Sequence, residues 1–154
     1  MRKITVSAFL NKFAPEPWCM IDERLKLKQA FLVLYSRMPD EVLEHLPKVI
    51  TIAPLPIQDA FTVHAPTSTE NDALIFVPPH YEGRDQEDNN FMLAHEFAHI
   101  VLRHHEHPRF DVWNNVQEYC NLPVERDADA LAAKWGYTIP IERTVARDNL
   151  PNKE

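Results

Sequence analysis

The sequence predicts one α+β domain, because a helical stretch is followed by short strands and then by further helices. Residues 22–35 combine an acidic start with a long apolar run, as helices do. Three runs bounded by proline are rich in β-branched or aromatic residues, as strands are: 48–53, 60–64 and 73–77. With 154 residues, 45% of them hydrophobic, the chain can bury one core. We expect a small mixed sheet packed on helices, within a domain spanning residues 1–140.

The remaining elements follow in chain order. Pro39 and the two acids after it begin a short second helix. Residues 81–90 are polar, and Asp88 or Asn89 would cap the helix that starts at Phe91. Residues 111–120 are expected to form a connecting helix, and residues 141–154 a loosely held tail.

Residues 91–102 are apolar except for His95, Glu96 and His99, which form the pattern H-E-x-x-H. Residues four apart lie one helical turn apart on one face, so the two imidazoles can share a metal ion. Glu96 lies about 100° around the helix from His95, close enough to reach a water on that ion and act as its general base. Zinc suits two imidazoles and a carboxylate, so we expect one Zn²⁺.

A catalytic zinc needs a third protein ligand, and the sequence offers two. His105 fits the last position of H-E-x-x-H-x-x-G-x-x-H, but Leu102 stands where that pattern has glycine. Glu125 lies in an amphipathic helix that begins at Pro123 and stops at Gly136. We favour Glu125, with Asp129 one turn later accepting the second ring N–H of a bound histidine.

The segments 94–99 and 125–132 together resemble glutamate-zincins, and most closely the ImmA/IrrE-like minimal zinc peptidases. The resemblance implies a minimal zincin-like domain, with zinc on His95, His99 and Glu125 and with Glu96 as the base. It also implies an edge strand along the substrate cleft. We assign that place to residues 73–77, although an ordinary interior strand is the alternative.

The expected activity is therefore that of a zinc metallopeptidase, in which Glu96 takes a proton from the attacking water and delivers it to the leaving amine. The alternative is a zincin-fold module that binds zinc and serves a regulatory or interaction role. The residue that stabilises the oxyanion is left open among five candidates. They are Tyr119, Arg126, His104, His105 and His107.

Composition and charge limit the classes of partner that we expect. The net charge of −7 disfavours binding to nucleic acid, and no apolar run approaches the length of a membrane span. Cys19 and Cys120 are too few for a disulfide scaffold, and no signal segment is visible, so we expect a cytoplasmic protein. The expected partners are a protein or peptide substrate and a regulatory protein.

Overall fold

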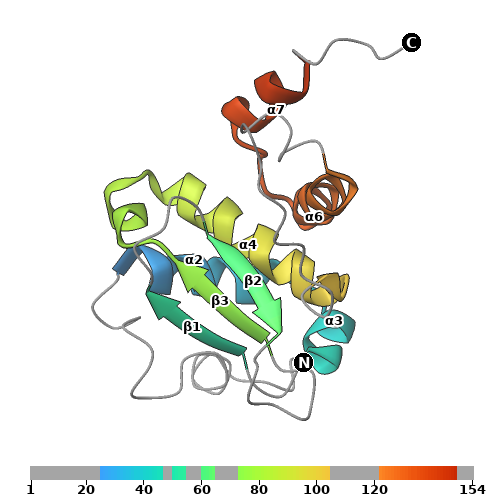
Figure 1. Ribbon diagram of the computed structural model, residues 1–154. Coiled ribbons are helices and arrows are strands. Elements are labelled where there is room, and N and C mark those ends of the chain that lie inside the picture. Colours follow the sequence, from blue (N-terminus) through green and yellow to red (C-terminus); the bar gives the residue numbers. More distant parts are fainter. Residues whose placement is uncertain (1–24, 47–49, 55–59, 65–72, 105–121, 149–154) are drawn as a thin grey trace.

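The structure is a computed structural model that describes residues 25–46, 50–54, 60–64, 73–104 and 122–148. These residues contain helices as well as a small mixed sheet (Figure 1). The predicted connecting helix over residues 111–120 lies outside them, as do residues 149–154 of the predicted tail. None of the described helices combines the length and apolar character needed to cross a membrane.

Helix α2 (Leu25–Arg37) packs one apolar face against the core. Leu27, Phe31 and Leu34 on this face are almost fully buried, and their spacing of three to four residues is that of one helical face. The Glu82 carboxylate accepts hydrogen bonds from the backbone N–H groups of Lys26 and Leu27, each at 3.3 Å. These contacts satisfy donors that the first helical turn leaves unpaired. Helix α3 (Asp40–His45) follows Pro39, as predicted.

The sheet contains β1 (Ile50–Pro54), β2 (Phe61–His64) and β3 (Ala73–Val77) in the order β1-β3-β2. β1 runs parallel to β3 and β2 runs antiparallel to it. The assignment of residues 73–77 to an edge was therefore wrong, and the interior alternative is correct. A continuous apolar run such as that of β3 suits a strand with neighbours on both sides. Of the two edge strands of the sheet that the described residues form, β2 is the one that packs more extensively against the H-E-x-x-H helix.

Helix α4 (Gln86–Val101) carries the H-E-x-x-H residues and begins earlier than predicted. Asp85 occupies the N-cap, after the short 3₁₀ helix η2 (Pro79–Gly83), so the expected cap at Asp88 or Asn89 was wrong. Asn89 is instead buried within the helix, where its Nδ2 donates to the carbonyls of Tyr81 and Asp85 at 2.8 and 3.0 Å. These bonds use both N–H groups of the side-chain amide, so a polar residue can stand inside the helix.

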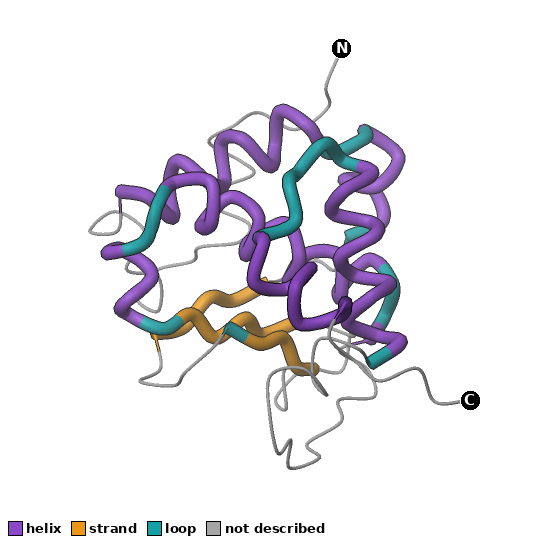
Figure 2. The backbone as a smooth tube through the Cα atoms, turned by 90° about the horizontal axis from the view of Figure 1, so that it is seen from above, coloured by secondary structure: helices purple, strands orange, loops and turns teal. Residues whose placement is uncertain are grey.

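Every residue of α4 from Phe91 to Ile100 is buried. Helices α2 and α6 pack against α4, and β2 also contacts it. Phe31 of α2 meets Phe97 of α4 edge to face, with ring centroids 5.8 Å apart. Viewed from above, the strands form a layer along one side of the helices (Figure 2). The H-E-x-x-H residues thus lie in the interior of the fold.

Helices α6 (Pro123–Lys134) and α7 (Ile141–Asp148) complete the described chain, with α7 on the side of α6 away from the sheet (Figure 1). α6 ends at Lys134, just before Gly136, the stop that the sequence predicted, whose φ of 88° favours glycine. The expectation of a loose tail from residue 141 was wrong for residues 141–148. They form a helix whose Arg143 makes two ion pairs with α6.

Candidate metal centre

The two histidines of the motif face one another on α4. Their Nε2 atoms are 3.0 Å apart and their ring planes are nearly perpendicular, at 85°. Both residues are buried, at 3% exposure for His95 and 8% for His99. The helical repeat alone places residues 95 and 99 one above the other, as the sequence predicted.

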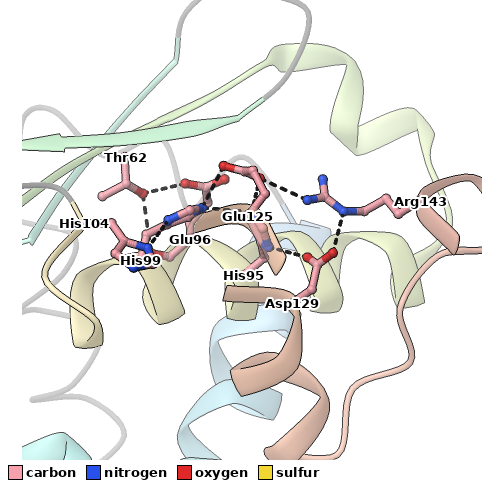
Figure 3. Close-up of polar contacts among 8 residues, drawn as sticks. All are labelled: Thr62, His95, Glu96, His99, His104, Glu125, Asp129 and Arg143. Carbon is pink, nitrogen blue, oxygen red and sulfur yellow. Dashed lines mark hydrogen bonds and ion pairs between the residues drawn. The ribbon is translucent and has the colours of Figure 1, made fainter. Parts of the chain in front are cut away.

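Glu125 of α6 completes a three-residue group with these histidines (Figure 3). Its Oε2 lies 3.0 Å from the Nε2 of His95, and its Oε1 lies 3.2 Å from the Nε2 of His99. One ligand atom from each of the three residues lies within 4.8 Å of the others, so the group could hold a metal ion. His105, the other third ligand considered, lies outside the described residues.

The donor set fits a metal ion. Two imidazole nitrogens and a carboxylate converge from different helices in a place that is almost closed to water. Ionisable groups brought together at such a place are normally paired with one another or with a metal. Two imidazoles and one carboxylate also leave room for a fourth ligand in a tetrahedral arrangement.

The acids and histidines of the centre shift one another's pKa values. Burial opposes ionisation of Glu125, but hydrogen bonds from His95 and His99 outweigh it and hold the pKa of Glu125 far below its usual range. Burial likewise disfavours the cationic form of His95, yet Asp129 and Glu125 together raise the pKa of His95 to about 9. Glu125 is therefore an anion at any physiological pH, which is the form that binds metal.

Asp129 orients His95 through the ring nitrogen that faces away from Glu125. Its Oδ1 lies 2.7 Å from the Nδ1 of His95, and the residue is fully buried. When the ring is neutral, a carboxylate at Nδ1 holds the remaining proton there, so Nε2, the atom turned toward Glu125, is the one that would be free to bind a metal. This is the role that the sequence suggested for the second carboxylate of α6.

His104 lies at the Nδ1 of His99, as Asp129 lies at the Nδ1 of His95. The Nδ1 atoms of the two residues are 2.9 Å apart, so one donates and the other accepts. Burial, followed by the proximity of His99, lowers the pKa of His104, which suits the neutral form that such a bond needs.

Among the five oxyanion candidates, Arg126 is exposed on α6. The other three lie outside the described residues, namely Tyr119, His105 and His107.

Glu96 is buried on the side of α4 that faces β2. Thr62 of β2 donates from Oγ1 to Oε2 of Glu96 at 2.5 Å. Figure 3 shows the Glu96 carboxylate between Thr62 and the group formed by the histidines and Glu125.

Two residues of the centre were missed by the sequence reasoning. Thr62 lies in a strand that the pattern did locate, but no sequence signal shows which helical residue it faces. Arg143 lies in a stretch interpreted as a tail, although it contacts both Glu125 and Asp129. Comparison of the chain with family models, with curated proteins and with solved structures gave no match.

Proposed function

We propose that the protein is a zinc-dependent metallopeptidase with zinc on His95, His99 and Glu125. The observation that carries the proposal is the convergence of Glu125, from a second helix, on the two histidines of the H-E-x-x-H pattern. Two imidazoles and a carboxylate form a borderline ligand set, for which zinc is the first choice. The sequence resemblance to ImmA/IrrE-like minimal zinc peptidases agrees with this ligand assignment, and a minimal zincin-like domain is part of the proposal.

In this proposal Glu96 is the general base. Zinc, when bound, would polarise the scissile carbonyl and make a coordinated water acidic near neutral pH. Glu96 accepts a proton from the attacking water and later passes it to the leaving nitrogen. Thr62 engages Oε2 of Glu96, so we assign the proton transfer to Oε1.

The substrate is a protein or peptide segment in extended form. We assign its binding to β2, because β2 lies at an edge of the sheet among the described strands and Thr62 links it directly to Glu96. The open edge of a strand offers backbone N–H and C=O groups to an added peptide. A peptide paired there would run past the carboxylate that moves the proton.

Replacement of the base tests the activity. Glu96→Gln keeps the size and polarity of the side chain, so it should retain one zinc per chain and the fold. It should lose about 10²–10⁴-fold in cleavage rate, which is the usual contribution of general acid–base catalysis. Cleavage is measured on a broad peptide library with zinc-loaded protein.

Glu87→Gln is the matched control, since it makes the same change at an exposed position of α4. It should cleave at the wild-type rate. Equal cleavage by Glu96→Gln and wild type would reject Glu96 as the base. If zinc-loaded wild type cleaves nothing in the library, the zinc-binding module becomes the better description.

A further inference from the structure

Arg143 is the residue of α7 that reaches the metal centre (Figure 3). Its Nη2 donates to Oε2 of Glu125 at 3.0 Å, and its Nε donates to Oδ2 of Asp129 at 3.1 Å. The Arg143 side chain is only 19% exposed, and both carboxylates are more deeply buried. The contacts are therefore partly shielded from water, which strengthens them relative to surface ion pairs.

The two carboxylates act on different parts of the centre. Glu125 faces the Nε2 atoms of both histidines, whereas Asp129 faces the Nδ1 of His95. One guanidinium therefore joins a metal ligand to the residue that orients a second ligand. The two acids stand one turn apart on α6, and the planar fork of arginine spans such a pair.

We infer that Arg143 is a positioning residue of the metal centre and that helix α7 thereby belongs to that centre. The inference rests on the proposed metal site and does not depend on peptidase activity. Two buried anions one turn apart repel each other, and a cation donating to both offsets that repulsion while fixing their rotamers. Residues that orient metal ligands in this way commonly change metal affinity when they are replaced.

In the part of α7 whose side chains the structure describes, the large apolar residues Ile141 and Val145 are 75% and 50% exposed, so they contribute little packing. Arg143 links α7 to the metal centre through its two ion pairs, and its guanidinium carbon lies 6.0 Å from the centroid of the Phe91 ring on α4. The position of α7 and the geometry of the ligands should therefore depend on the same side chain.

The test is the zinc affinity of the full chain, measured by competition with a chromophoric chelator in the absence of substrate. Arg143→Gln should weaken zinc binding about 10–100-fold, the usual effect of losing a residue that orients a ligand. Lys134→Gln removes one positive charge from an exposed site on α6 and should change the affinity less than about twofold. Arg143→Lys keeps the charge but lacks the fork, so its affinity should be intermediate.

Thermal unfolding with and without zinc separates positioning from general stability. A ligand stabilises a fold according to its affinity, so the zinc-induced rise in Tm should be smaller for Arg143→Gln than for wild type. A purely structural role would lower both melting temperatures equally and leave the rise unchanged, which would overturn the inference. Arg143→Lys supplies the same comparison if Arg143→Gln folds poorly.

The outcomes also separate the two proposals. Wild type that binds zinc tightly, together with an Arg143→Gln variant of equal affinity, would reject the role of Arg143 and leave the metal centre intact. Wild type that binds no zinc would reject both. Because the measurement uses no substrate, a failure to detect proteolysis does not alter the affinities expected here.

Discussion

Thr62 and Glu96 join the edge strand of the sheet to the buried helix α4. The Oγ1 of Thr62 donates to Oε2 of Glu96 at 2.5 Å, and Thr62 also lies 3.4 Å from the backbone carbonyl of Glu96. A hydroxyl has one proton to donate. Of the two possible acceptors, the carboxylate oxygen is the stronger and lies closer, so it receives the proton. The carboxylate that we assign as the base is therefore held by the strand to which we assign the substrate.

Thr62→Val should impair cleavage without releasing zinc. Valine keeps the β-branched shape suited to a strand but removes the hydrogen bond, so the Glu96 carboxylate loses its fixed orientation. A hydrogen bond to a charged group contributes about 1.5–3 kcal/mol, so cleavage should fall roughly 10–100-fold. Peptide cleavage and zinc content are measured on the same preparation. Thr62→Ser keeps the hydroxyl and should restore most of the activity. Loss of zinc from the valine variant would show that Thr62 acts on the ligands instead.

Glu125→Gln should weaken zinc binding sharply, whereas His105→Ala should leave it nearly unchanged. Only the first change removes an anionic donor from the group that faces both histidines. A zinc competition titration of both variants ranks the two residues. The opposite ranking would transfer the third-ligand role to His105.

Zinc binding should release a proton at pH 7.5. In the metal-free protein, Asp129 and Glu125 overcome the effect of burial and raise the pKa of His95 to about 9, above its ordinary value of 6.5. Because His95 binds its proton more tightly in the folded state, protonation stabilises the metal-free fold. This contribution is fully present below pH 6.5 and is lost as the pH rises through about 9. Zinc must displace that proton, so the apparent affinity should rise up to about tenfold per pH unit between 7 and 9.

Calorimetry in buffers of different ionisation enthalpy counts the released protons. Asp129→Asn provides the control, since it removes one of the two acids that raise the pKa of His95. The variant should release a smaller fraction of a proton at the same pH. Zinc binding that shows no dependence on buffer ionisation would contradict the assigned protonation of His95.

Phe31→Ala should destabilise the metal-free protein by about 3–5 kcal/mol, since it empties a fully buried site against Phe97 of α4. Urea unfolding followed by circular dichroism measures the loss. Leu25→Ala, at a position of α2 that is 73% exposed, should cost less than about 0.5 kcal/mol. Equal effects of the two changes would contradict the packing of α2 on α4 described here.

The sequence was most informative where a pattern is local. The apolar run of residues 73–77 has the same bounds as β3, and the spacing of His95 and His99 fixes their common face because helical geometry is regular. Glu125 and Asp129 also share a face for this reason. Their approach to the histidines could be inferred only from ligand chemistry, because it depends on how α6 packs against α4.

The sequence was least informative where charge or tertiary order decides the structure. The polar stretch before Phe91 extends α4 because Asn89 finds backbone partners, which periodicity does not register. In helix α7 the apolar residues Ile141 and Val145 are exposed, and the link of the helix to α6 is the ionic contact of Arg143, which hydrophobic periodicity does not register. Strand order could not be derived from strand composition, and β3 was therefore placed at the edge instead of the centre.

His95 and Glu125 are 30 positions apart in the chain and come from different helices. An ion bound to both would join the two helices at a place where their ligands meet only in the folded chain. Its binding free energy would therefore add to the stability of the fold, since the unfolded chain would have to release the ion. The metal would then oppose global unfolding, and its removal would make the chain more susceptible to proteolysis.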